Sequence, residues 1–456
     1  MDRQPHRPVG RGRLRLVKSS AATDPTTDPY VPGHGDHSFE VDHYALELSY
    51  SVESNSLTGR AVITATALTD LDRFELDLYH LRVSKVTVDG AAPTKYSHRK
   101  SRLVVRPRAA IGEGQSFTVV VAYAGSPRPM PGLDGDAGWE ELADGVIVAS
   151  QPHGAPSWFP CNDRPSNKAT YEIETTVPAG YVVVANGELE SQRRRAGGTV
   201  WKHVESAPMA TYLATVQIGR YESVEAGGAV PIRTVFPAGT RDRSVESFAR
   251  QPDMMELFVR SFGDYPFASY TAVITEDELE IPLEAQGLSV FGSNFTTDEW
   301  EHQRLIAHEL AHQWFGNSLT LTHWRDIWLH EGFACYAEWL WSEESGGPSA
   351  DDRAEEQWQR LEQLPQDLVL GDPGPDLMFD DRVYKRGALL LHALRLTVGD
   401  DAFFALLRTW TTRYATGSVV TEEFVAVAAE LCGAAVGQLF DAWLRDTALP
   451  ELPSLP

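Results

Sequence analysis

Apolar and polar residues alternate along many short stretches in the first half of the chain, which is the pattern of strands with one buried face. The clearest run has Tyr44, Leu46, Leu48 and Tyr50 at every second position. Similar runs, rich in Val, Thr and Phe and separated by turn signals, predict an antiparallel β-domain over residues 31–222. The predicted strands are Tyr44–Tyr50, Ala61–Ala67, Arg73–Leu78, Val83–Val88, Leu103–Val105, Phe117–Tyr123, Gly145–Ala149, Thr170–Val177, Tyr181–Ala185, Thr199–His203 and Thr211–Ile218.

From about residue 223 the apolar residues recur at the spacing of helices. The predicted helices are Ser244–Phe262, Trp300–Trp314, Asp326–Glu343, Ala354–Leu364, Tyr384–Val398, Asp401–Tyr414 and Thr421–Leu431. Two more strands, Tyr270–Val273 and Leu288–Phe291, lie between the first and second of these helices. Residues 223–447 are therefore predicted to form a mostly helical domain, and the chain an α+β fold of two domains with a C-terminal tail at 448–456.

Composition and charge narrow the class of protein. The 456 residues are 42% hydrophobic and 23% charged, as in soluble globular proteins. Forty Lys and Arg residues against 64 Asp and Glu residues give a net charge of −24, which disfavours nucleic acid as a partner. No apolar stretch approaches the ~20 residues of a membrane-spanning helix, so we expect no membrane partner.

The N-terminus and the cysteines indicate in which cellular compartment the protein works. Residues 1–30 are rich in Arg, Pro, Ser and Thr and have no apolar core, so they are predicted to be a flexible basic tail and not a secretory signal. The three cysteines are scattered and do not form a disulfide framework. Together these features favour a cytoplasmic protein.

The strongest chemical signal is His308-Glu309-Leu310-Ala311-His312, which lies in a predicted helix. Two histidines four residues apart lie one turn apart on a helix, so both imidazole rings can reach one metal ion. Neutral imidazole suits zinc, and Glu309 stands where a carboxylate can meet a water on the metal without binding the metal. By chance such a motif is expected roughly 0.03 times in a chain of this composition.

A catalytic zinc site has three protein ligands and one open position, so a third ligand is required. Glu331 lies 19 residues after His312, on the next predicted helix, and the intervening loop lets that helix turn back toward both histidines. We therefore predict one zinc ion per chain, held by His308, His312 and Glu331, with Glu309 as the general base. A donor to the oxyanion is also needed, and spacing alone does not identify it.

These segments resemble the aminopeptidase N family, gluzincin zinc peptidases related to leukotriene hydrolase. Besides the metal motif, the matching segments are Trp328-Leu329-His330-Glu331-Gly332-Phe333-Ala334, Phe159-Pro160-Cys161-Asn162-Asp163 and Tyr384-Lys385-Arg386-Gly387-Ala388. The resemblance implies a saddle-shaped N-terminal β-domain packed on a thermolysin-like catalytic domain, and a peptide as the substrate.

The resemblance also implies roles for further residues. Tyr384 corresponds to the donor to the oxyanion. Glu284 corresponds to the glutamate that holds the free α-amine of the substrate, although its segment departs from the family's G-x-M-E-N pattern. Gln151 lies in the second amine-binding segment, which here has no carboxylate, so weaker recognition of the N-terminus is expected. Glu338 and Asp326 are expected to orient a histidine ligand without binding the metal themselves.

The favoured function is thus a zinc metallopeptidase acting mainly as an aminopeptidase. The chain ends soon after Leu444, where many family members continue into a helical domain that caps the cleft. We therefore expect an open cleft that also permits endopeptidase activity, for example in trimming a leader peptide. Two alternatives are hydrolysis of a non-peptide substrate such as an epoxide, and a non-catalytic peptide-binding scaffold. The presence of all four metal-site residues disfavours the scaffold.

Overall fold

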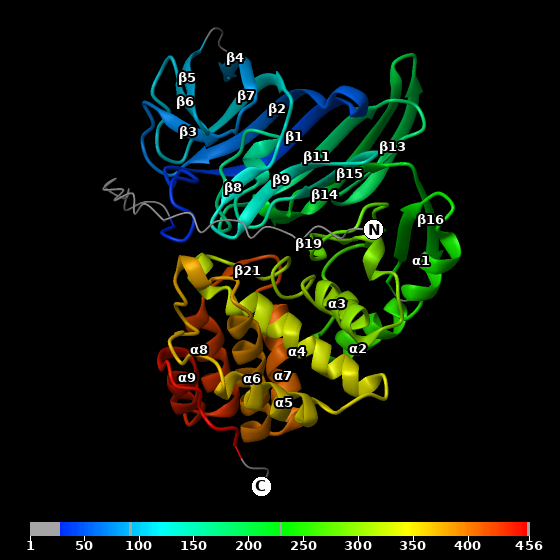
Figure 1. The fold of residues 1–456 in the computed structure, drawn as a ribbon. Coiled ribbons are helices and arrows are strands. Elements are labelled where there is room, and N and C mark those ends of the chain that lie inside the picture. Colours follow the sequence, from blue (N-terminus) through cyan, green and yellow to red (C-terminus); the bar gives the residue numbers. More distant parts are fainter. Residues whose placement is uncertain (1–27, 91–93, 229, 454–456) are drawn as a thin grey trace, which may run out of the picture.

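Strands build the first half of the molecule and helices most of the second. The computed structural model describes residues 28–90, 94–228 and 230–453. The β-rich part, coloured blue to green in Figure 1, lies across the helical part, coloured yellow to red. The predicted α+β architecture of two domains is confirmed. The predicted basic tail lies outside the described residues except for its last three, of which Tyr30 is buried.

A seven-stranded sheet forms the frame of the β-domain. Its order is β13-β14-β11-β1-β2-β7-β4. Alternate residues of β1, among them Tyr44, Leu46, Leu48 and Tyr50, are buried, as the period of two predicts. The sheet is antiparallel except that β1 pairs in parallel with β11. Its strands are β1 (Phe39–Ser51), β2 (Ser56–Ala67), β4 (Arg82–Val88), β7 (Ser116–Gly125), β11 (Lys168–Val177), β13 (Glu188–Arg195) and β14 (Gly198–Ala210).

Two smaller sheets complete the β-domain, with the orders β12-β15-β10-β9-β8 and β3-β6-β5. Their strands are β3 (Phe74–Asp77), β5 (Lys95–Arg99), β6 (Arg102–Arg106), β8 (Met130–Gly132), β9 (Gly135–Leu142), β10 (Gly145–Ala149), β12 (Val182–Ala185) and β15 (Val216–Gly219). The predicted strand Thr211–Ile218 is wrong over its first half, because residues 211–213 form a 3₁₀ turn. That turn carries Tyr212 into the seam between the domains, where its ring packs on Trp324.

The second domain begins with a mixed sheet of order β16-β17-β18-β20-β19. Its strands are β16 (Tyr221–Ala226), β17 (Ile232–Pro237), β18 (Tyr270–Ile274), β19 (Leu283–Ala285) and β20 (Leu288–Phe291). The three inner strands are parallel, and β19 is an antiparallel edge strand. This edge lies between the β-domain and the helices in Figure 1, which brings Glu284 to the seam.

The described part of this domain has nine helices, of which the first two lie between β17 and β18: α1 (Arg241–Ser247), α2 (Gln251–Phe262), α3 (Trp300–Ala311), α4 (Trp328–Glu344), α5 (Ala350–Glu362), α6 (Asp381–Val398), α7 (Asp400–Arg413), α8 (Thr421–Cys432) and α9 (Val436–Arg445). The predicted helix Ser244–Phe262 is in fact two, because the helix is interrupted at 248–250 and α2 begins at Gln251 with Pro252 in its first turn. Helix α4 is buried from Trp328 to Ser342, so it is the core of this domain. No helix in the described part of the chain is long and apolar enough to cross a membrane.

Candidate active site

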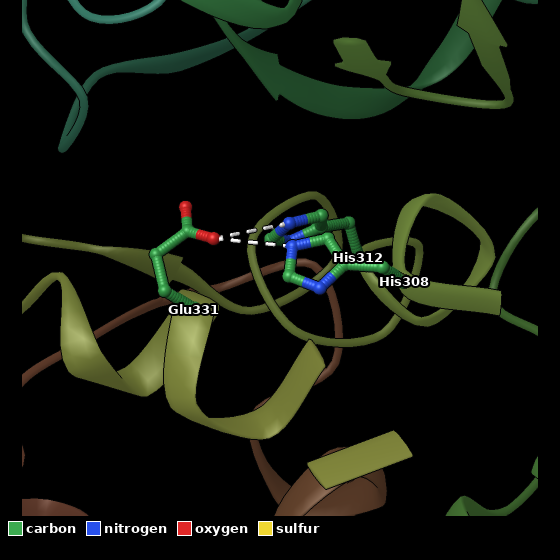
Figure 2. A group of neighbouring side chains, drawn as sticks. All are labelled: His308, His312 and Glu331. Atoms are coloured by element: carbon green, nitrogen blue, oxygen red, sulfur yellow. Dashed lines mark ion pairs between the residues drawn. The ribbon is translucent and has the colours of Figure 1, made fainter. Parts of the chain in front are cut away.

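His308, His312 and Glu331 converge at the meeting of two helices. The histidines lie at the C-terminal end of α3, and Glu331 lies in the first turn of α4. Glu331 Oε2 lies 3.4 Å from the Nε2 atom of each histidine. Figure 2 shows the carboxylate pointing toward both rings from the opposite helix. All three side chains are buried, and their ligand atoms lie within 4.8 Å of one another.

The backbone between the two helices brings these groups together. Helix α3 ends at Ala311, and Gly316 follows with φ of 125°, a conformation that favours glycine. A Cβ atom at Gly316 would lie 3.3 Å from His312 Nδ1, so the chain passes closely behind the second histidine. The loop then returns through a 3₁₀ turn at residues 324–326 to start α4.

Each histidine ring makes a hydrogen bond through Nδ1, and this bond directs its Nε2 atom toward Glu331. His308 Nδ1 lies 2.8 Å from Glu338 Oε1, and His312 Nδ1 lies 3.0 Å from the carbonyl oxygen of Phe315. Glu338 therefore lies where the sequence analysis expects an orienting carboxylate. The prediction that Asp326 orients a histidine is wrong. Its Oδ1 atom accepts a 2.6 Å hydrogen bond from Thr421 Oγ1, because the 3₁₀ turn that carries Asp326 faces the start of α8.

Two cations surround the other oxygen of Glu338. Arg304 Nη1 lies 3.2 Å and Lys385 Nζ lies 3.9 Å from Glu338 Oε2. Burial raises the pKa of Glu338, but Lys385, the contact with His308 and Arg304 outweigh it and lower the pKa to about 2. The carboxylate that orients His308 is therefore charged at neutral pH.

Glu309 and Glu284 face the same space. Glu309 is buried, and its Oε2 atom has no hydrogen-bond partner among the described residues. Glu284, Glu309 and His312 also bring their polar atoms within 4.8 Å of one another. Burial raises the pKa of Glu309 and of Glu284, against the opposing influence of the nearby histidines. An acceptor without a partner is thus available beside the metal ligands.

The β-domain contributes Gln151 to this space. Gln151 Nε2 donates a 2.6 Å hydrogen bond to Glu284 Oε1, so the two predicted amine-binding residues meet across the seam. Tyr384 lies in the first turn of α6, and its ring is stacked at 6.1 Å from the His308 ring. Burial and the negative charges of Glu331 and Glu284 raise the pKa of Tyr384 well above 10, so the hydroxyl keeps its proton.

Two glycines set the distance between the helices that carry Glu331 and Tyr384. A Cβ atom built on Gly387 of α6 would lie 2.8 Å from the Cα atom of Gly332 in α4. Both glycines stand in the segments that carry the family resemblance. Their contact gives a packing reason for residues without side chains in the interior of two helices, where glycine costs helix stability.

The donor set suits a zinc ion. Two imidazole nitrogens and one carboxylate oxygen are the donors of a catalytic zinc site that keeps a position open. Three carboxylates, those of buried Glu309 and Glu331 and of half-buried Glu284, lie around the histidines and would repel one another without a cation. A dication at this point offsets that charge.

Some site residues escaped the sequence analysis. Arg304 lies one turn before His308 and Lys385 lies within the segment of Tyr384, yet their role depends on the distances between three helices. Gln313 directly follows the metal motif, Asn317 lies four residues later, and both hold the turn after Glu284. Their spacing of four residues was the only signal in the sequence.

Comparison with known proteins gives matches in both domains. Residues 40–213 match the peptidase M1 N-terminal domain, and residues 248–443 match the peptidase family M1 domain. The M1 zinc metallopeptidase of Deinococcus radiodurans is 31% identical, with a TM-score of 0.87 over 94% of this chain and 99% of that chain. Yeast LTA4 hydrolase is 21% identical and shares the fold, with a TM-score of 0.80 over 97% of this chain and 74% of that chain.

Curated relatives are longer. Aminopeptidase A of Gloydius brevicauda is 28% identical over 90% of this chain and 46% of its own length. Aminopeptidase M1 of Arabidopsis thaliana is 26% identical over 67% of this chain and 37% of its own length. The chain thus spans about half or less of the length of these two relatives.

Proposed function

The chain belongs to peptidase family M1, the zinc metallopeptidases, and from this premise we propose that it is an aminopeptidase that removes residues from the free N-terminus of peptides. The observation that carries the proposal is the contact between Gln151 and Glu284 beside Glu309. This contact supports the proposal because the Glu284 carboxylate and the Gln151 amide lie together near Glu309, where they could hold a free α-ammonium.

The metal ligands and the general base have separate roles in this proposal. His308, His312 and Glu331 would hold a zinc ion, which would polarise the scissile carbonyl as a Lewis acid and acidify a water molecule. Glu309 takes the proton of the attacking water on its unpartnered oxygen and delivers it to the leaving amine. Its raised pKa suits a group that both accepts and returns a proton.

Two further groups act on the substrate. The Tyr384 hydroxyl, which keeps its proton, donates a hydrogen bond to the developing oxyanion. Glu284 pairs with the ammonium of the substrate, and the carbonyl of Gln151 accepts a second hydrogen bond from it. Because only one of these groups is charged, affinity for the free amine is expected to be moderate.

The substrate class is part of the proposal. A mutant of the Deinococcus radiodurans relative has been solved with a Tyr-Ser-Ala substrate, and we propose short peptides for this chain as well. Internal cleavage of longer peptides, such as leader segments, is a secondary activity that the same experiment tests. The intact set of His308, Glu309, His312 and Glu331 argues against a silent scaffold, and no contact among the described residues favours an epoxide.

Matched peptides with a free and an acetylated N-terminus separate these activities. The zinc-loaded protein is incubated with each peptide, and the products are identified by mass spectrometry. Stepwise loss of single residues from the free peptide alone supports the aminopeptidase, whereas internal cuts in both peptides would make the protein an endopeptidase. A Glu309→Gln variant serves as the control and should leave both peptides intact.

A further inference from the structure

The turn that follows Glu284 is held by side-chain amides from the end of the metal-binding helix. Gln313 Oε1 accepts a 2.9 Å hydrogen bond from the Gly287 backbone N–H. Two amides donate to the carbonyl oxygen of Ala285, Gln313 Nε2 at 3.2 Å and Asn317 Nδ2 at 2.9 Å. Gln313 and Asn317 are fully buried. The carbonyl next to Glu284 is therefore fixed from one side by two residues that follow His312.

A lysine of the β-domain fastens the loop that contains Asn317. Lys168 Nζ, at the start of β11, donates to the carbonyl oxygens of Asn317 at 3.0 Å, Ser318 at 2.8 Å and Gly417 at 3.4 Å. No carboxylate among the described residues lies within ion-pair distance of this ammonium. All three acceptors belong to the other domain, so the lysine links the two domains directly behind the amine-binding turn.

The same turn is held from the β-domain. Asn186 Nδ2 donates a 2.9 Å hydrogen bond to the Gln286 carbonyl oxygen, and Gln286 Nε2 donates at 3.2 Å to the carbonyl oxygen of Ala207. Asn186 and Gln286 are fully buried. The turn after Glu284 is thus clamped between the two domains by side-chain amides, and its position depends on how the domains meet.

We infer that Lys168 is a positioning residue for the substrate's free amine: by fastening Asn317 it fixes the Ala285 carbonyl and thereby aims Glu284. The inference rests on the proposed aminopeptidase function. Without the ammonium, the carbonyl of Ser318 loses its donor, and those of Asn317 and Gly417 keep only their bonds from Thr320, so the loop is held less firmly. A shift on the order of 1 Å at a positioning group is enough to weaken its interaction strongly.

The expected effect is on substrate binding more than on the chemical step. Neither Lys168 nor Asn317 contacts Glu309 or Tyr384, the groups proposed to move the proton and hold the oxyanion. Asn317 does donate its backbone N–H to the carbonyl oxygen of His312, at 3.0 Å, so zinc affinity must be measured in parallel. An effect confined to Glu284 raises KM and leaves kcat and zinc affinity unchanged.

The test compares Lys168→Met and Lys168→Arg with the wild type, using Lys202→Met as the matched control. Lys202 lies on β14 of the same sheet and pairs with surface Glu172 and Glu190, away from the seam. For a free-amine peptide we expect Lys168→Met to raise KM about tenfold with kcat within about twofold. Lys168→Arg, which keeps a cation, should recover most of the loss, and Lys202→Met should match the wild type.

Each outcome decides the inference. An unchanged KM in Lys168→Met overturns it, and so does a parallel loss of kcat and zinc affinity, measured by competition with a chelator, because that means general disruption. If Lys168→Met does not fold, Asn317→Ser, which removes the bond to Ala285, must raise KM alone, and an unchanged KM again overturns the inference. A wild-type protein that does not cleave the free-amine peptide would instead defeat the proposed function.

Discussion

Tyr384 illustrates how one hydroxyl can be tested apart from folding. Its oxygen makes no hydrogen bond within the described residues, and its ring packs against His308. We predict that Tyr384→Phe keeps this packing, leaves stability within about 0.5 kcal/mol and lowers kcat about 100- to 1000-fold with little change in KM. Steady-state kinetics with a free-amine peptide and denaturant unfolding measure both. A kcat within a few-fold of the wild type would remove Tyr384 from the mechanism.

Glu205 adds a pH dependence to the stability of the fold. The side chain is buried in the seam, where burial raises its pKa to about 7 despite the Ala207 N–H and Gln286 donors. A carboxyl whose pKa rises on folding stabilises the protein below pH ~4.5, and this stability is lost as the pH rises through ~7. We predict that Glu205→Gln removes up to about 3 kcal/mol of this pH dependence.

Urea unfolding at pH 5 and pH 8 measures the effect of Glu205. The wild type should lose more stability than Glu205→Gln between these two values. An equal loss of unfolding free energy in both proteins would mean that folding does not raise the pKa of Glu205 and that water reaches this side chain.

At the scale of elements, the contact between α4 and α6 links the metal ligand Glu331 to Tyr384. A methyl group at Gly387 would meet the backbone of Gly332 at 2.8 Å, so one helix must move. We predict that Gly387→Ala destabilises the protein by about 2 kcal/mol and lowers kcat as Tyr384 is displaced. Unfolding and kinetic measurements on the same variant test both effects.

Gly437 in α9 provides the matched control for the helix contact. A Cβ atom there meets nothing within 4 Å, so Gly437→Ala should be neutral or stabilising by up to about 1 kcal/mol through helix propensity. Equal behaviour of the two substitutions would show that the α4–α6 contact tolerates separation.

Element prediction from the sequence succeeded where one face is buried. Gly145–Ala149 and Leu288–Phe291 are strands with the predicted bounds, because their apolar residues are buried against neighbours. Strand β13 was not predicted, since its sequence Glu-Leu-Glu-Ser-Gln-Arg-Arg-Arg has no apolar alternation and is held by backbone bonds to β14. Helix α9 was also missed, although its apolar face is buried at Phe440 and Trp443.

The candidate site, too, could be predicted only where its signal is local in the sequence. Spacing along single helices predicted that His308, His312 and Glu331 would meet, and the structure brings them together. The contacts of Gln313 with Ala285, and of Lys168 with Asn317, join segments more than 25 residues apart. No local period encodes such contacts, because they arise only when distant segments of the chain pack together.

At the scale of the whole molecule, both domains build the site, and its charge couples folding to the metal. Gln151 comes from the β-domain, while the metal ligands come from α3 and α4. Without a cation, the neighbouring carboxylates of Glu284, Glu309 and Glu331 repel one another or must take up protons. A ligand that binds only the folded state stabilises it by about 3 kcal/mol at 100 times its Kd.

We therefore predict that removing zinc with a chelator lowers the unfolding temperature of the wild type by several degrees and that added zinc restores it. A His308→Ala variant serves as the control, because it lacks one ligand and should respond weakly to chelator and to zinc. Calorimetry or fluorescence detects the shift without any substrate, so the result is independent of peptidase activity. If chelator leaves the wild-type unfolding temperature unchanged, the three neighbouring carboxylates do not depend on a dication, and the charge argument for the metal site fails.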